Sequence, residues 1–307
     1  MRNRFLFFLG FIICFLVLSY LFLYFKAGSQ EIVISIRIPR FLLTLVTGFI
    51  LAGLGYVYQI VLNNPLAEPY ILGISSGAAF GSILAAVSGL FLLMPLFGFI
   101  GAVLTMFLVW QLARLGGFFS STKLLLSGII VGLFFSALIS VIMYFNQKDI
   151  GNIINVLMGN LGHVFSNLEW TIFRYILIVS LVIMLYLFSQ SEKINIISTG
   201  DEIATSLGVN VTRLRKLLFL LGSLLTGVVV AYAGIIGFVG LIVPHIVRIL
   251  TRGNKRYNLI LSACGGAFFL LFCDFIAMHL TIVELPVGII TSFLGCPFFV
   301  FILVKNK

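Results

Sequence analysis

The chain has 307 residues, of which 61% are hydrophobic and only 9% are charged, and it carries a net charge of +10. Soluble globular domains contain roughly 45–50% apolar and about 25% charged residues, so this composition excludes a soluble protein. Because a bilayer accepts helices, whose backbone groups are satisfied internally, the sequence predicts an all-α polytopic membrane protein with a single transmembrane domain over residues 1–307.

Charge-free stretches of about 20 residues predict ten membrane-spanning helices. They lie at 5–25, 41–62, 70–88, 92–113, 124–145, 170–189, 214–233, 237–251, 258–278 and 285–304. The first lacks a small-x-small cleavage pattern, so it is predicted to be a retained helix and not a signal peptide. The eighth is short and contains Gly237, Gly240 and Pro244, which leaves open whether it is broken or re-entrant.

Lysine and arginine set the orientation of the predicted helices. With the N-terminus in the cytoplasm, 14 of the 19 basic residues fall in cytoplasmic segments, and the five outside are Lys26, Arg37, Arg40, Lys148 and Arg174. This bias predicts that both termini are cytoplasmic. It also explains the net positive charge without a nucleic-acid partner.

The sequence lacks the patterns of an enzyme, a metal site or an ion-coupled carrier. Its four cysteines lie in apolar spans without a C-x-x-C pair, and its three histidines are far apart, so no metal site, catalytic residue or bound cofactor is predicted. It contains no P-loop pattern and no paired carboxylates within a span, so any energy from ATP must come through a partner. A secondary carrier and a membrane-embedded transferase are alternatives that no motif supports.

A polar segment, residues 190–216, interrupts the apolar sequence. It holds a quarter of the 28 charged residues, namely Glu192, Lys193, Asp201, Glu202, Arg213, Arg215 and Lys216. Thr199 and Glu202 have the spacing of a capping box and Gly208 supplies a stop, which predicts about two turns of helix. Ile203, Ala204 and Leu207 would form an apolar face that rests against a partner or on lipid. The basic residues 213–216 are predicted only to anchor the seventh span.

Two loops flank the second span. Arg37 and Arg40 precede it on the outer side, and their simplest interpretation is that they extend to the membrane surface at a helix end. Asn64 begins a run with prolines at 65 and 69 on the inner side, which predicts a rigid turn between helices.

Six ordered motifs carry a resemblance to a known family. They are Arg37–Arg40 (RIPR), Asn64–Pro69 (NPLAEP), Leu72–Gly77 (LGISSG), Ser206–Val209 (SLGV), Gly237–Arg248 (GFVGLIVPHIVR) and Glu284–Gly288 (ELPVG). The chain resembles the FecCD-type permeases of bacterial ABC importers for iron-siderophore, haem or cobalamin, and it is similar to the vitamin B12 importer permeases. A permease for zinc or manganese is the nearest alternative within the ABC class.

The resemblance implies a multi-pass permease of the bacterial cytoplasmic (inner) membrane that works by alternating access. It implies a homodimer, two cytoplasmic ATPase subunits that hold ATP and Mg, and an extracytoplasmic binding protein that delivers the metal chelate. Which chelate is transported does not follow from these motifs.

The resemblance also assigns roles to residues. The polar segment becomes a cytoplasmic coupling loop, and the coupling positions are Thr199, Gly200, Asp201, Glu202, Ala204, Leu207 and Gly208. The cytoplasmic gate would comprise Asn64, Leu66, Ser120, Ser121 and Thr122. Arg37 and Arg40 would dock the binding protein, whereas a third docking arginine of the cobalamin permeases is replaced here by Met278, beside His279.

Overall fold

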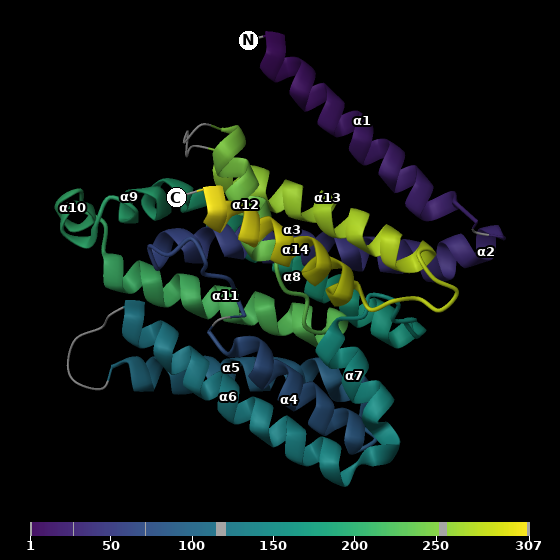
Figure 1. The fold of residues 1–307 in the computed structure, drawn as a ribbon. Helices are drawn as coiled ribbons and strands as arrows, with labels where there is room; N and C mark the ends of the chain where they lie inside the picture. Colours follow the sequence, from purple (N-terminus) through teal and green to yellow (C-terminus); the bar gives the residue numbers. More distant parts are fainter. Residues whose placement is uncertain (1, 27, 71, 115–120, 252–256, 306–307) are drawn as a thin grey trace.

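The computed structural model describes residues 2–26, 28–70, 72–114, 121–251 and 257–305, and these form helices and loops without a strand (Figure 1). Each predicted span contains one helix of 12 or more residues. These helices are α1 (Arg2–Tyr24), α3 (Ile38–Val61), α4 (Ile74–Val87), α5 (Met94–Ala113), α6 (Ser121–Phe145), α8 (Asn167–Ser189), α11 (Val211–Ala233), α12 (Val239–Leu250), α13 (Asn258–His279) and α14 (Val287–Lys305). The prediction of an all-α polytopic fold is confirmed.

Shorter elements that the span pattern did not predict connect these helices. They are α2 (Gln30–Ile32), the π-helical η1 (Val33–Arg37), the 3-10 turns η2 (Phe91–Leu93) and η3 (Gln147–Asp149), α7 (Ile150–Met158), α9 (Ser191–Ile197) and α10 (Asp201–Ser206). Helices α9 and α10 lie at the end of the molecule where the C-terminal helix finishes, and α2 lies at the opposite end (Figure 1). We name them the inner and the outer end after the orientation that the basic residues of the sequence predict.

Helix α3 lies at the centre of the fold, where it packs along α13, α12 and α11, while α4, α5 and α6 form a neighbouring layer (Figure 1). Small residues make these contacts close. A side chain at Gly48 would overlap the carbonyl oxygen of Gly266 on α13, and one at Gly55 would overlap that of Gly240 on α12. Backbone therefore meets backbone at both interfaces.

We expect Gly48→Ala to destabilise the protein, because the added methyl group would force α3 and α13 apart. Overpacking of this kind costs about 1–3 kcal/mol. The measurement is the apparent melting temperature in detergent, with Gly151→Ala as control, since a side chain at Gly151 meets no atom within 4 Å. Equal melting temperatures of the Gly48→Ala and Gly151→Ala variants would refute the close contact between α3 and α13.

Two spans are only partly helical. At a rise of 1.5 Å per residue, the 14 residues of α4 reach about 21 Å and the 12 residues of α12 about 18 Å, less than the roughly 30 Å of a bilayer core. Helix α12 continues through Pro244, and irregular residues 234–238 precede it. The eighth span is therefore a short unbroken helix with a non-helical entry.

The non-helical segments before α4 and α12 contact each other inside the protein. The Tyr70 hydroxyl accepts a hydrogen bond from the Ile236 N–H at 3.2 Å. Gly234 and Phe238 have φ values of 69° and 70°, so this entry bends in the left-handed region. Irregular backbone at membrane depth is tolerated where protein groups surround and satisfy it, as they do here.

Candidate functional site

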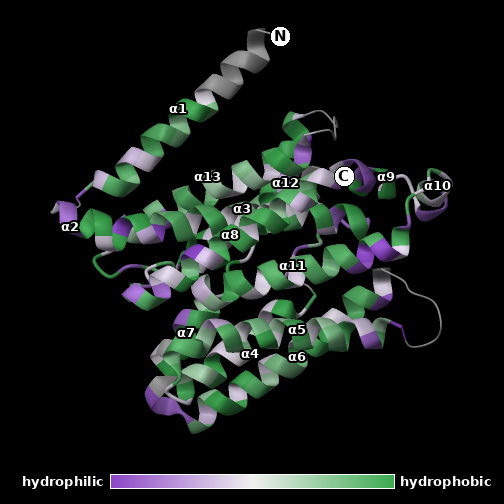
Figure 2. Ribbon diagram, turned by 180° about the vertical axis from the view of Figure 1, so that it is seen from behind, coloured by the Kyte–Doolittle hydropathy of each residue, from purple (hydrophilic) through white to green (hydrophobic). Residues whose placement is uncertain are grey.

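The polar segment forms α9 and α10 at the inner end of the molecule. Figure 2 shows hydrophilic residues gathered in α10 and at the adjoining end of α11, whereas the long helices are mainly hydrophobic. Helix α9 is anchored to the rest of the protein by Ile194 and Ile197, which are buried. The Tyr56 hydroxyl of α3 also donates a hydrogen bond to Asn195 Oδ1 at 2.7 Å. Helix α9 is therefore joined to α3 by a hydrogen bond as well as by packing.

Helix α10 begins differently from the predicted capping box. Its N-cap is Gly200 with φ of 111°, and no side chain caps it. The Thr199 hydroxyl instead donates to the Ile196 carbonyl at 2.7 Å, because it lies within reach of the last turn of α9. The predicted capping box of Thr199 and Glu202 is thus wrong, and the helix spans Asp201–Ser206.

The predicted stop at Gly208 is confirmed. Gly208 has φ of 82°, its N–H bonds to the Thr205 carbonyl at 2.9 Å, and the Val209 N–H bonds to the Ala204 carbonyl at 3.0 Å. This pair of bonds is a Schellman motif, for which glycine is favoured because it adopts positive φ without a steric penalty. The end of α10 is therefore fixed in direction.

The predicted apolar face of α10 divides into two parts. Ala204 is fully buried within the protein, whereas the side chains of Ile203 and Leu207 are 53% and 62% exposed. Ile203 and Leu207 are four residues apart and so lie on the same side of the turn. They form an apolar pair at the inner end of the molecule, described below as the exposed pair.

An ion pair that the sequence did not predict holds α10 against α11. Arg215 binds Asp201 through both guanidinium NH2 groups, with Nη1–Oδ2 and Nη2–Oδ1 distances of 2.6 and 2.8 Å. Bidentate geometry of this kind fixes orientation as well as distance. The basic residues 213–216 therefore include a positioning residue for α10. Asp201 and Arg215 are 14 positions apart and lie on different helices, so the i,i+4 spacing of a single helix could not predict their contact.

The predicted gate is only partly described. Asn64 Oδ1 accepts a hydrogen bond from the Leu66 N–H at 2.9 Å, which confirms a rigid turn, and Leu66 is 51% exposed. Ser120 and the side chain of Ser121 lie outside the described residues, while Thr122 is exposed near the start of α6. The association of Asn64 and Leu66 with residues 120–122 stays a prediction.

Glu68 connects this turn to α12. Its carboxylate accepts a hydrogen bond from the backbone N–H of Phe238, the N-cap residue of α12. Burial raises the pKa of Glu68 to about 7, against the opposing effect of that hydrogen bond. The Glu68 carboxyl group, which lies in the loop before α4, therefore titrates near neutral pH.

The stability of the protein is expected to fall as the pH rises through 7. A carboxyl group with a raised folded-state pKa stabilises the fold below its unfolded pKa, and this contribution is lost as the group ionises. We expect a lower melting temperature at pH 8 than at pH 6, and a smaller difference for Glu68→Gln. An unchanged pH dependence in this variant would contradict the assignment to Glu68.

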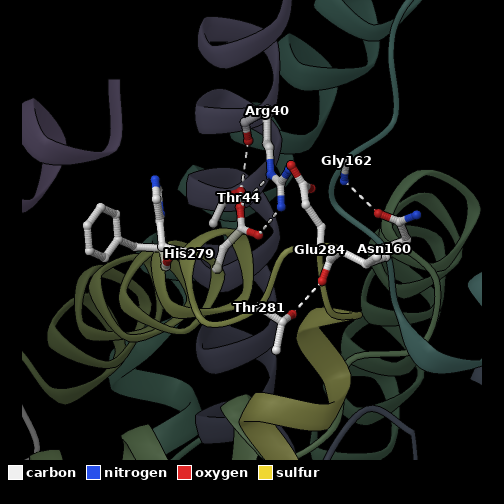
Figure 3. Close-up of polar contacts among 10 residues, drawn as sticks. Arg40, Thr44, Asn160, Gly162, His279, Thr281 and Glu284 are labelled. Atoms are coloured by element: carbon white, nitrogen blue, oxygen red, sulfur yellow. Dashed lines mark hydrogen bonds and ion pairs between the residues drawn. The ribbon is translucent and has the colours of Figure 1, made fainter. Parts of the chain in front are cut away.

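At the outer end, Arg40 lies in a polar cluster that comprises the buried Arg37, Arg40, Thr44 and Asp274 and the half-exposed Glu284; it is named the arginine cluster. Arg40 Nε and Nη2 donate to the two carboxylate oxygens of Asp274 at 3.1 and 2.8 Å, and Nη1 donates to Glu284 Oε2 at 2.5 Å. Thr44 donates to Asp274 Oδ2 at 2.9 Å. Figure 3 shows Arg40, Thr44 and Glu284 converging beside Gly162. Asp274 is therefore held inside the protein by three hydrogen bonds.

Arg37 is bound to the end of α1. Its Nη1 donates to the carbonyl oxygens of Phe22, Leu23 and Phe25 at 3.0, 3.3 and 2.7 Å. Arg37 and Arg40 are only 8% and 5% exposed, so the simple interpretation of two arginines extended to the membrane surface is wrong. Their predicted docking of a binding protein stays a prediction.

The position of the missing third arginine has an apolar environment. Met278 packs with the small core between α1 and α13, and the His279 ring lies beside Phe25 and Phe275, with centroid distances of 5.2 and 4.6 Å. Among the described residues, no group of three or more His, Cys, Asp or Glu side chains is arranged to hold a metal ion.

Comparison with known proteins agrees with this architecture. The vitamin B12 import system permease protein BtuC of Klebsiella pneumoniae is 36% identical, over 92% of this chain and 85% of its own length. An iron chelatin transport system permease protein of Helicobacter pylori is also 36% identical, with the same coverage of the two chains. The solved structure of an inward-facing metal-chelate-type ABC transporter has a TM-score of 0.82 and 31% identity, and it covers 97% of this chain and 98% of its own. Residues 6–305 match the FecCD transport family, and the chain belongs to that family.

Proposed function

We propose that this chain is the membrane-spanning subunit of an ABC importer that takes up a metal chelate of the iron-siderophore, haem or cobalamin class. The family, the vitamin B12 and iron chelatin relatives and the fold support this function over a zinc or manganese permease. The observation that carries it is α10, a short helix fixed to the chain on one side with two apolar side chains exposed on the other. Such an element fits a separate ATPase subunit.

The subunit acts in a homodimer with two cytoplasmic ATPases, which hold ATP and Mg, and with an extracytoplasmic binding protein. A movement of the ATPase displaces α10, and the Arg215–Asp201 pair passes this displacement to α11. The hydrogen bond from Tyr56 to Asn195 passes it to α3. Because α3 ends at Val61, directly before the turn with Asn64 and Leu66, the displacement reaches the proposed gate within a few residues.

Docking of the binding protein takes place at the outer end, near the arginine cluster. Charge pairs at such a surface steer association and fix the orientation of the partners. The loop between α13 and α14 supports this location, because Ile282 and Val283 project from it into solvent beside the cluster. These side chains offer apolar contact next to a charged group.

Uptake into proteoliposomes tests this function. We expect import of a chelate only when the ATPase, ATP and the loaded binding protein are all present, because no energy source lies on this chain. Import by the purified chain under an ion gradient, without ATPase, would instead identify a secondary carrier.

A further inference from the structure

Arg40 binds two carboxylates in different environments. Asp274 has no exposed side-chain surface, lies within helix α13 and is held by three hydrogen bonds from Arg40 and Thr44. The side chain of Glu284 is 54% exposed, and its bond to Nη1 is its one contact with the cluster. Asp274 is therefore fixed to the Arg40 guanidinium inside the protein, whereas Glu284 binds the guanidinium through one nitrogen at the solvent-exposed side of the cluster.

The loop that carries Glu284 faces solvent. Residues 280–286 between α13 and α14 have no helix, Ile282 and Val283 are exposed, and the Leu285 N–H bonds to the Ala277 carbonyl at 3.2 Å. Gly162 lies behind the ion pair, where a side chain would come within 3.3 Å of Arg40 Nη1 and 3.4 Å of Glu284 Oε2. Asn160 Oδ1 lies 3.1 Å from the same position, so Gly162 and Asn160 line the protein side of the ion pair, and the half-exposed Glu284 covers the other side.

The charges of the cluster cancel while Glu284 is bound. Arg37 and Arg40 supply two positive charges, and Asp274 and Glu284 supply two negative ones. A carboxylate that approaches this group meets no net attraction from it. When Glu284 leaves, the net charge of the cluster becomes +1, and Arg40 Nη1 is free to donate a hydrogen bond to an incoming carboxylate.

We propose that Glu284 occupies the position at which a carboxylate of the extracytoplasmic partner binds. This inference rests on the proposed docking of a binding protein at the arginine cluster. During docking, the partner's carboxylate replaces Glu284 at Arg40 Nη1, while Asp274 holds the guanidinium in place. The exchange keeps the number of charge-assisted hydrogen bonds constant, and its cost is the displacement of Glu284.

Affinity for the partner is the measurement that tests this exchange. The permease complex, with its ATPase subunits in nanodiscs, is titrated with its binding protein in the chelate-free form. We expect Glu284→Gln to tighten binding about three- to tenfold, because a half-exposed ion pair no longer competes. Glu31→Gln is the control, since Glu31 is an exposed acid at the same end, and we expect it to leave the affinity unchanged. Unchanged or weaker binding by Glu284→Gln would overturn the proposal.

A second variant separates exchange at Arg40 from a general effect of charge. In Arg40→Lys the positive charge remains for Asp274, but the planar donor group is lost. If Glu284 and the partner's carboxylate exchange at Arg40, Glu284→Gln should not tighten binding in the Arg40→Lys background. Tighter binding in that background would refute the exchange. If Arg40→Lys weakens binding and Glu284→Gln alone has no effect, the binding protein docks at the arginine cluster without displacing Glu284, and the exchange proposal is refuted. If neither variant changes the affinity for the binding protein, the proposal that this protein docks at the arginine cluster is refuted as well. Melting temperatures of all variants show whether they are folded.

Discussion

Replacing both Ile203 and Leu207 with serine is expected to separate the ATPase subunit from the permease. Burying each of these side chains in a partner contributes about 1.5–3 kcal/mol, and 1.4 kcal/mol corresponds to about tenfold in affinity. The double variant should therefore bind the ATPase about a hundredfold more weakly or worse, and should lose ATP-driven uptake. Both side chains are exposed, so the fold should be unaffected.

Leu104→Ser provides the matched control for this double variant. Leu104 is 53% exposed on α5, similar to Ile203 and Leu207, but it lies within a membrane-spanning helix. Its replacement should leave ATPase association intact. Wild-type association by the double serine variant would show that the exposed pair is not a contact of the ATPase.

The second large effect is expected at the buried pair of Arg40 and Asp274. Asp274→Ala leaves the guanidinium of Arg40 buried with Nε and Nη2 unpaired. Removal of one partner of a buried ion pair costs up to about 3–5 kcal/mol. Arg40 keeps Glu284 at Nη1, so the loss comes from the two guanidinium donors that stay buried without an acceptor. We expect a large fall in the apparent melting temperature in detergent.

The double variant Arg40→Met with Asp274→Leu tests the cause of that fall. Apolar replacement of both members of a buried ion pair is often neutral, since neither charge then has to be buried. We expect it to regain most of the stability that Asp274→Ala loses. A double variant as unstable as Asp274→Ala would show that the loss comes from packing and not from an unpaired charge.

The features that local sequence determines were predicted well. The ten spans follow from apolar length, and the stop at Gly208 follows from the conformational freedom of glycine. The capping box failed because two helix ends lie within four residues of each other. The Thr199 hydroxyl donates to a carbonyl in the last turn of α9, and the N-cap position of α10 falls on Gly200, which has no side chain.

The features that depend on tertiary contact could not be read from the sequence. Arg40 and Asp274 are 234 positions apart, and Tyr56 and Asn195 are 139 apart. No periodic pattern relates residues at such distances. Arg37 and Arg40 were therefore expected to extend to the membrane surface, although the fold provides both with internal partners. The sequence identifies the residue types of the site, and the packing of α1, α3 and α13 decides what they contact.

The central claim is that α10 touches the ATPase that drives transport. Cysteine cross-linking in the assembled importer tests it most directly, after the chain's own four cysteines are replaced by serine or alanine. A cysteine at position 207 is expected to cross-link to the ATPase subunit, with a yield that changes when ATP binds, while one at position 104 gives no such product. Absence of a 207 product in an importer that still transports the chelate would contradict the account.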